Sequence, residues 1–154
     1  MPREGGRALS EGEIALCRPL FGGTIDYAAV RLHRRRWWPF QPRETVMAPD
    51  GHIWFHPKGS AWREDFADAS ITLQGLLAHE MVHVWQRQHG LFLPLRRHPF
   101  CRYDYALKPG WPLARYGIEQ QAEIVRHAFL LSHGCPVAGA PPAEAYRLLL
   151  PRLI

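Results

Sequence analysis

The stretch LLAHEMVHVWQRQHG, residues 76–90, is the most informative part of the sequence for the fold, and it contains the pattern His-Glu-x-x-His. Residues four apart share one face of a helix, so His79 and His83 can both direct a ring nitrogen at one metal ion about 2.0–2.1 Å away. Glu80 flanks the same site, where its carboxylate can take a proton from zinc-bound water. The motif predicts a zinc site with its own catalytic base. The alternative is two histidines and a glutamate that share a helix by coincidence.

The residues around the motif predict one long helix over residues 70 to 89. Asp68 and Ser70 offer N-cap oxygens before it, and Gly90 supplies a stop after it. Apolar residues recur between these ends at helical spacing. They are Leu73, Leu76, Leu77, Met81, Val84 and Trp85. A helix with this apolar pattern suits the wall of a dry, pre-organised site.

Catalytic zinc is usually held by three protein ligands and a water, so a third ligand is needed. His89 lies six residues after His83, which is the metzincin spacing, but Gln86 stands where that pattern needs glycine. Metzincins also have a methionine turn downstream of the motif. The only methionines here are Met1, Met47 and Met81. The metzincin interpretation therefore fails twice.

A better third ligand lies on a second predicted helix, over about residues 114 to 132. Glu119 and Glu123 are four apart and so share a face of this helix. One can bind the metal while the other hydrogen-bonds a ligand histidine and fixes its tautomer. We expect Glu119 to be the ligand and Glu123 the supporting residue, as in the gluzincins, although their second acid is Asp. The alternative is an exposed acidic face.

The rest of the chain predicts a single loop-rich α+β domain. The 154 residues are 47% hydrophobic and include 13 Gly and 14 Pro, which fits one core over residues 14–154 after a flexible lead of residues 1–13. Residues 25–32 predict a strand, and residues 45–55 predict a hairpin around Pro-Asp-Gly. An exposed hairpin edge can hold an extended substrate. A short helix is expected after residue 141.

A peptidase site also needs a hydrogen-bond donor for the oxyanion of the tetrahedral intermediate. Residues 91–112 lack a sustained helical or strand spacing of apolar residues and so predict a long loop. Loops of this length are often functional. Tyr105, in the Tyr-Asp-Tyr stretch of this loop, is our candidate for a catalytic donor. Core packing is the competing role for any such tyrosine. The other candidates are Tyr103, Tyr116 and His127.

The chain is mildly basic, with a formal net charge of +5 and a pI of about 9.5. Basic residues cluster only at Arg34–Arg36 and Arg96–His98. Short runs of this kind are usually solvated surface, so nucleic acid is not an expected partner.

The cysteines and the N-terminal residues indicate the cellular compartment in which the protein is made. Cys17, Cys101 and Cys135 are odd in number and far apart, which argues against disulfides and favours a reducing compartment. The first 13 residues lack the apolar core of a secretory signal, and no stretch is long enough to predict a membrane span. We therefore expect synthesis in the cytoplasm, with any export by another route.

The sequence resembles the small bacterial zinc metallopeptidases of the Vgr-related and Rhs-associated type, which are linked to contractile type VI-like secretion systems. Three blocks carry the resemblance: residues 76–90, YDYAL (103–107) and GIEQQAEIV (117–125). It extends over residues 20 to 131, with FGGTIDYAAVRL and a hairpin ending in GHIWF. It implies a zincin-like fold, in which a small twisted sheet with a hairpin packs on the HExxH helix beside a second ligand-bearing helix.

The resemblance also implies roles for individual residues. His79, His83 and Glu119 would be the zinc ligands, and Glu80 the base. Trp85 would serve packing, and Gln86 would support the helix or a neighbouring loop. Glu123 is less firmly implied, because the family varies at that position.

We therefore predict a zinc-dependent metallopeptidase that cleaves a protein or peptide through a Glu-activated, zinc-bound water. This enzyme would be associated with a type VI-like secretion system, and its partners would include proteins of the secretion apparatus. One alternative is a non-catalytic, zinc-stabilised structural or adaptor domain of a secretion particle, to which His89 would add a fourth ligand. Another is a SprT-like DNA-associated protease, which would use a third histidine further downstream.

Overall fold

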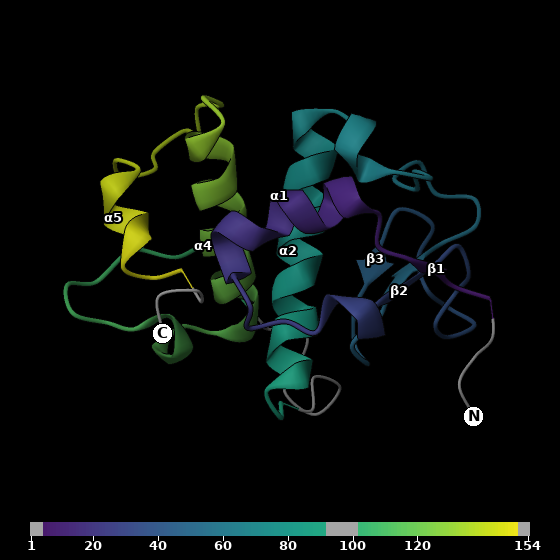
Figure 1. The fold of residues 1–154 in the computed structure, drawn as a ribbon. Coiled ribbons are helices and arrows are strands. Elements are labelled where there is room, and N and C mark those ends of the chain that lie inside the picture. The colour runs from purple at the N-terminus through teal and green to yellow at the C-terminus, as the bar shows by residue number, and fades with distance from the viewer. Residues whose placement is uncertain (1–4, 92–101, 151–154) are drawn as a thin grey trace.

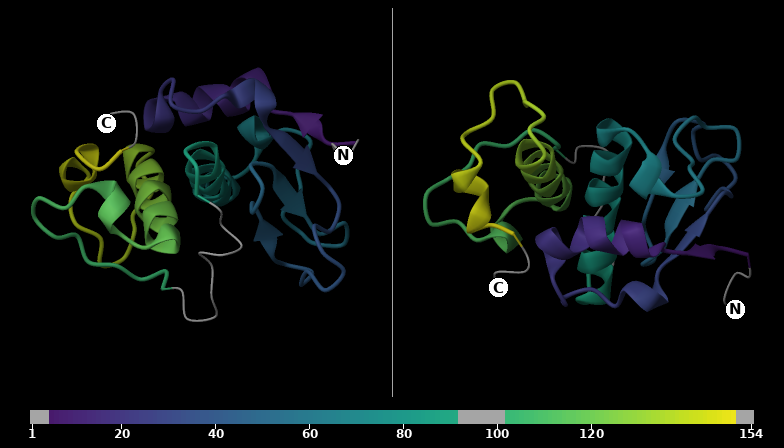
Figure 2. Two further views of the ribbon diagram at one scale, coloured as in Figure 1. Left: turned by 90° about the horizontal axis from the view of Figure 1, so that it is seen from below. Right: turned by 45° about the horizontal axis from the view of Figure 1, so that its top comes forward.

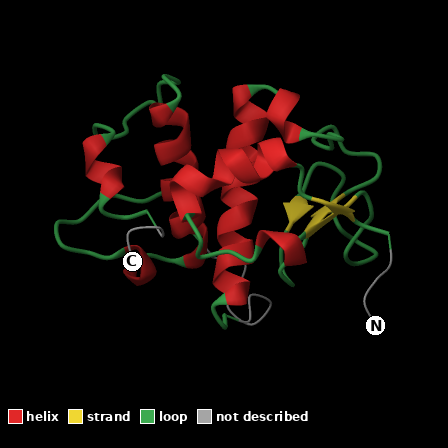
Figure 3. Cartoon of the chain, in the orientation of Figure 1, coloured by secondary structure: helices red, strands yellow, loops and turns green. Residues whose placement is uncertain are grey.

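A small sheet and two long helices dominate the computed structural model, which describes residues 5–91 and 102–150. Figure 1 shows helix α2 (Ile71–Gln88) in the middle, with the sheet on one side and helix α4 (Ile118–Ser132) on the other. The strands gather at one end of the molecule, while helices fill the middle and the opposite end (Figure 3). This is the mixed α+β architecture that the sequence predicts.

Helix α2 is the predicted motif helix. The Ser70 hydroxyl caps it by accepting a hydrogen bond from the backbone N–H of Leu73. His89 forms its C-cap, and Gly90 follows with a φ of 96°, a left-handed conformation that favours glycine. The predicted boundaries of residues 70 and 89 are therefore close to the observed ones.

Helix α4 begins later than predicted, because residues 113–115 form a separate 3₁₀ turn (η3, Leu113–Arg115). Gly117 is the N-cap residue of α4, and its backbone N–H donates to the side-chain oxygen of Gln120. The helix packs closely on α2 at Gly75, where an added Cβ would lie 3.2 Å from Leu130. The short C-terminal helix α5 (Glu144–Arg147) is present as predicted, on the outer side of α4 (Figures 1 and 2).

The sheet has the strand order β1-β2-β4-β3. Strand β1 (Arg7–Ala8) pairs antiparallel with β2 (Arg31–His33), and β2 pairs parallel with β4 (Ile53–Phe55). Strand β3 (Val46–Met47) pairs antiparallel with β4 and lies at an edge of the sheet. The predicted hairpin is therefore confirmed, and its exposed edge is β3.

The predicted strand over residues 25–32 is only partly correct. Residues Tyr27–Ala29 form a 3₁₀ turn (η1), and the strand covers only Arg31–His33. Both backbone hydrogen-bonding groups of Asp26 are bound by the side chain of Gln88 at the end of α2, at 2.8 and 3.1 Å. Since these groups bind α2, they do not take part in a strand ladder.

Part of the predicted flexible lead over residues 1–13 has regular structure, because it contains β1 and the start of the first helix. Helix α1 (Glu11–Phe21) starts at a capping box between Ser10 and Glu13 and crosses α2 (Figure 2). Glu13 is fully buried and receives two hydrogen bonds from Arg7, both 2.8 Å long. The Ser-x-x-Glu pattern is a recognisable signal for a helix start. Residues 1–4 of the predicted lead lie outside the described residues.

The core lies around α2, which buries Met81, Val82 and Val84 on different sides of the helix. Cys17 and Cys135 are free thiols, in line with the predicted absence of disulfides between them. Cys101 and the Arg96–His98 cluster lie outside the described residues. Within the described ranges, no helix combines the length and apolar character needed to cross a membrane.

Candidate metal centre

Two histidines of the motif face α4 from successive turns of α2. His79 and His83 are 9% and 7% exposed, and their ring centroids are 5.2 Å apart. Their placement follows from the four-residue spacing, which puts them on one side of the helix. Both rings are therefore removed from bulk water and held next to each other.

Glu119 completes the cluster from the first turn of α4. Its Oε1 lies 2.6 Å from Nε2 of His83 and 3.5 Å from Nε2 of His79. Ligand atoms of these three buried residues all lie within 4.8 Å of one another. The tight packing of α4 on α2 thus brings Glu119 next to two histidines that lie 40 and 36 positions earlier in the sequence.

Glu123 supports His79 from the next turn of α4. Its Oε2 lies 3.1 Å from Nδ1 of His79. Arg126 donates a hydrogen bond to each of the Glu123 carboxylate oxygens, at 2.5 and 3.0 Å. A carboxylate oxygen can only accept, so Nδ1 of His79 is the protonated nitrogen in a neutral ring. Its Nε2 is then left with a lone pair that faces Glu119 and His83.

Gln86 supports His83 in the same way from within α2. The Nε2 group of Gln86 donates to the backbone carbonyl of Ile118 and to Oε1 of Gln121, both at 3.0 Å. Because a carbonyl can only accept, the amide orientation of Gln86 is fixed, and its own oxygen must face His83. Nδ1 of His83 donates to that oxygen at 2.9 Å, so in a neutral ring Nε2 of His83 is the nitrogen whose lone pair can bind a metal ion.

The electrostatics of the cluster favour carboxylates in their charged form. Burial would raise the pKa of Glu119, but hydrogen bonds with His79 and His83 outweigh burial and hold it well below its ordinary value. The pKa of Glu123 is lowered to about 2 against the effect of burial, by hydrogen bonds with His79 and Arg126. Conversely, burial would lower the pKa of His79, but the two glutamates raise it to about 9. Before metal binds, His79 therefore carries a proton that a metal ion must displace.

A pocket of about 410 Å³ opens over the cluster and gives access to it. Glu80, 5% exposed, lines this pocket together with His79, His83 and Glu119. Thr45 and Val46 line it from the sheet, so the edge strand β3 forms part of its wall. The motif base and an exposed strand edge therefore meet at the same opening.

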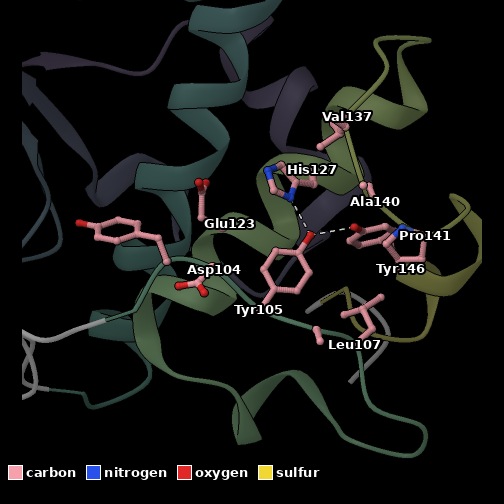
Figure 4. Close-up of a pocket in the computed structure, with 13 residues that line it drawn as sticks. Asp104, Tyr105, Leu107, Glu123, His127, Val137, Ala140, Pro141 and Tyr146 are labelled. Atoms are coloured by element: carbon pink, nitrogen blue, oxygen red, sulfur yellow. Dashed lines mark hydrogen bonds between the residues drawn. The ribbon is translucent and has the colours of Figure 1, made fainter.

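The candidate oxyanion donors are not all in this pocket. Tyr103 lines it, and its ring stacks on His79 with centroids 6.2 Å apart. The Tyr105 hydroxyl instead bonds to Nδ1 of His127 at 2.6 Å and to the Tyr146 hydroxyl at 2.7 Å, in a neighbouring pocket (Figure 4). Tyr116 lines neither pocket. By position, Tyr103 is better placed than Tyr105, whose catalytic role stays a prediction.

The neighbouring pocket has a volume of about 700 Å³ and lies between α4 and the chain that leads to α5. It shares Tyr103 and Glu123 with the pocket over the cluster, so the two are contiguous. Figure 4 shows the hydrogen-bonded Tyr105, His127 and Tyr146 side chains in its interior. The other lining residues are mostly apolar or small: Ala106, Leu107, Val137, Ala138, Gly139, Ala140 and Pro141.

His89, the rejected third histidine, lies outside the cluster. It is exposed at the end of α2, and its Nδ1 lies 2.8 Å from the backbone carbonyl of Trp85. Two other parts of the site were not foreseen. Arg126, three residues after Glu123, was missed although pairs at this spacing are common on helices. The role of Gln86 in orienting His83 depends on Ile118 and Gln121, so only the folded structure reveals it.

Comparison with known proteins relates this α+β domain to a protein of type VI secretion. No protein-family model matches the chain. Over 137 residues it is 47% identical to the type VI secretion system spike protein VgrG2b of Pseudomonas aeruginosa. The match covers 82% of this chain but only 13% of VgrG2b. The solved structure of the effector domain of P. aeruginosa VgrG2b is 43% identical and superposes with a TM-score of 0.74, covering 84% of this chain and 76% of that one.

These similarities define the class of the protein as an α+β domain related to a type VI secretion effector domain. The chain belongs to the family of the VgrG2b effector domain. The predicted relation to type VI secretion is confirmed at this level.

Proposed function

We propose that the chain is a zinc metallopeptidase of zincin-like fold with a gluzincin-like ligand set. His79, His83 and Glu119 would hold the ion, and Glu80 would act as general base. The observation that carries this proposal is the convergence of three buried ligand atoms from two helices, all within 4.8 Å, beneath a pocket that Glu80 also lines.

The donor set suits zinc. Two imidazole nitrogens and one carboxylate oxygen are a common ligand set of catalytic zinc sites, which keep a further position open. Tetrahedral ligands at about 2.0–2.1 Å from the ion lie about 3.3 Å from each other. The 3.5 Å and 2.6 Å separations between Glu119 and the two histidines lie on either side of that value. Small side-chain shifts would therefore admit the ion.

A bound zinc ion would supply Lewis-acid polarisation of a peptide carbonyl and acidify a water. The residues of the chain would perform the proton transfers. Glu80 would accept the proton of the attacking water as its oxygen bonds to the carbonyl carbon. It would then pass that proton to the amide nitrogen as the C–N bond breaks, so that a carboxylic acid and an amine leave. Tyr103, stacked on His79 at the pocket, would be placed to donate to the carbonyl oxygen.

The pockets suggest how a peptide would be held. An extended segment could pair with the edge strand β3, of which Val46 lines the pocket over the cluster. The contiguous pocket around Tyr105, His127 and Tyr146 would then receive one of its side chains. Burial and the charge of Arg126 lower the pKa of His127, which keeps this ring neutral. A large uncharged side chain therefore suits this pocket better than a charged one.

The membership of the VgrG2b effector-domain family supports a role as an exported effector. VgrG2b is a spike protein of a type VI secretion system, and this chain corresponds to a small fraction of its length. We propose that the domain is delivered by such a system and that its partners include proteins of the secretion apparatus. Its substrate would be a protein or peptide.

The experiment that tests the proposal compares zinc-loaded wild-type protein with the Glu80→Gln variant in a proteome-wide cleavage screen that reads new N-termini. We expect cleavage by the wild type and a rate about 10²–10⁴-fold lower for the variant, because the general base is lost. The variant should retain its zinc, since Glu80 is not a ligand. Equal cleavage by both proteins would refute the role of Glu80. Absence of cleavage with zinc fully bound would favour the non-catalytic structural domain.

A further inference from the structure

The segment RRRWWPF, residues 34–40, forms an exposed loop between β2 and β3, and we call it the Arg-Trp loop. Arg34, Arg35 and Arg36 are all exposed. Trp38 and Phe40 are 43% and 77% exposed, and they are two of only four large hydrophobic side chains exposed in the described part of the chain. Apolar and cationic groups thus share one short stretch of surface.

The charged residues in this stretch of the sequence are all of one sign. Residues 27–43 contain no aspartate or glutamate, while the net charge of the whole chain is only +5. The arginines of this stretch are Arg31, Arg34, Arg35, Arg36 and Arg43. Among the described residues, no ion pair involves the three consecutive arginines of the loop. Their charges are therefore available to an anionic partner.

The loop is held in one shape by a buried side chain at its base. Gln41 is 3% exposed and accepts a hydrogen bond from the backbone N–H of Trp37 at 2.8 Å. Its amide group donates to the backbone carbonyls of Thr45 and Trp54, which ties the loop to the sheet. Such an anchor presents Trp38 and Phe40 to the solvent without an ordering cost on binding.

We propose that the Arg-Trp loop binds the surface of an anionic lipid bilayer. The arginines would contact lipid phosphates, and Trp38 and Phe40 would enter the interfacial layer, where aromatic side chains are favoured. The geometry disfavours a single-stranded nucleic acid. The rings of Trp38 and Phe40 meet edge to face at 72°, with centroids 5.6 Å apart, and so do not offer parallel faces for successive bases.

Binding through this loop would place the metal pocket near the membrane. Thr45 and Val46 line that pocket, and Thr45 follows Phe40 by five residues, a span of at most about 18 Å. Lipid-bound protein would thus hold the opening of the pocket within reach of chains at the membrane surface. This inference does not depend on whether the site is catalytic.

The test is sedimentation of the full chain with two kinds of vesicle, pure phosphatidylcholine and phosphatidylcholine with about one-third phosphatidylglycerol. We expect binding to the anionic vesicles alone, together with a blue shift of tryptophan fluorescence. Replacing Arg34, Arg35 and Arg36 by Gln should weaken binding by about 100-fold, since each cation near an anionic surface contributes about fivefold. The double variant Trp38→Ser/Phe40→Ser should also weaken binding and lose the blue shift.

The matched control removes the same charge elsewhere, by replacing the exposed Arg102, Arg115 and Arg147 with Gln. We expect this variant to keep most of the binding, with circular dichroism confirming that all variants fold. Failure of the wild type to bind anionic vesicles would overturn the proposal, as would equal losses in the loop and control variants. Unchanged binding of the Trp38→Ser/Phe40→Ser protein would overturn the insertion of the aromatic side chains. Binding to a single-stranded oligonucleotide without binding to vesicles would replace the bilayer with nucleic acid.

Discussion

Gln86 determines which nitrogen of His83 faces the metal pocket, because its amide is oriented by the backbone carbonyl of Ile118. Replacing Gln86 by Met would keep the side-chain volume but remove the acceptor for Nδ1–H of His83. We expect zinc affinity to fall by about 10–100-fold, the usual effect of losing such a supporting contact. Competition with a coloured chelator would measure it.

Gln88→Met is the matched control for this variant, because Gln88 lies on the same helix but binds only the backbone of Asp26 in the described structure. Its zinc affinity should equal that of the wild type. If Gln86→Met also binds zinc like the wild type, then Gln86 does not orient His83.

His79 links metal binding to pH. Hydrogen bonds to Glu119 and Glu123 outweigh burial and raise its pKa to about 9, above the ordinary value of 6.5. At pH 7 the metal-free protein therefore has a protonated His79, and zinc must displace that proton. We expect about one proton to be released for each zinc bound at pH 7, and zinc affinity to rise from pH 6 to pH 9.

Calorimetry in buffers of different ionisation enthalpy would count this proton. In the metal-free protein, the same raised pKa stabilises the fold below the unfolded value of 6.5, and this contribution is lost as the pH rises through about 9. Zinc uptake at pH 7 without proton release would contradict the raised pKa of His79.

At the scale of elements, β1 and α1 are joined to the core by the buried carboxylate of Glu13. It accepts hydrogen bonds from Arg7 and from the backbone N–H groups of Ser10 and Phe66. These contacts outweigh burial and lower the pKa of Glu13. Replacing Glu13 by Gln would leave Arg7 without its charge partner.

We expect Glu13→Gln to lower the free energy of unfolding by about 3 kcal/mol, since breaking a buried pair leaves an uncompensated charge. Urea denaturation would measure the loss. Glu11→Gln is the control, because Glu11 is an exposed acid in the same first turn of α1. Equal effects of the two substitutions would mean that the turn needs only negative charge at the helix start, not the contacts of Glu13.

The sequence predicted those helices and strands whose ends are marked by residues within the element or next to it. The α2 boundaries follow from Ser70 and Gly90, and the β3–β4 hairpin follows from its Pro-Asp-Gly turn. The strand expected over residues 25–32 was shortened by Gln88, which is far away in the sequence and takes both backbone groups of Asp26. Contacts of that kind carry no local pattern, so periodicity could not foresee them.

In the candidate site, too, the features set by local spacing were predicted and those set by distant contacts were not. The spacing of His79 and His83 and of Glu119 and Glu123 predicted which side chains share a face, and the structure brings both faces together. The position of Tyr105 could not be predicted, because it depends on the path of the loop and on the partners His127 and Tyr146. Which tyrosine enters a pocket is a property of the folded loop, not of the motif.

At the scale of the whole molecule, the metal centre lies where two parts of the domain meet. Helix α2 belongs to the part that packs on the sheet, and α4 belongs to the part that packs on α5 (Figure 1). An ion held by His79, His83 and Glu119 would connect these parts through side chains from both helices.

The most direct test of this account is an equilibrium zinc titration of the wild type and the Glu119→Gln variant, because Gln keeps the shape of Glu119 but is a poor ligand. The exposed Glu144→Gln variant is the control for the lost charge. We predict one zinc per wild-type and control molecule, and an affinity at least about 100-fold weaker for Glu119→Gln. Full-strength binding of one zinc by Glu119→Gln would contradict the proposed metal centre, as would the absence of zinc binding by the wild type.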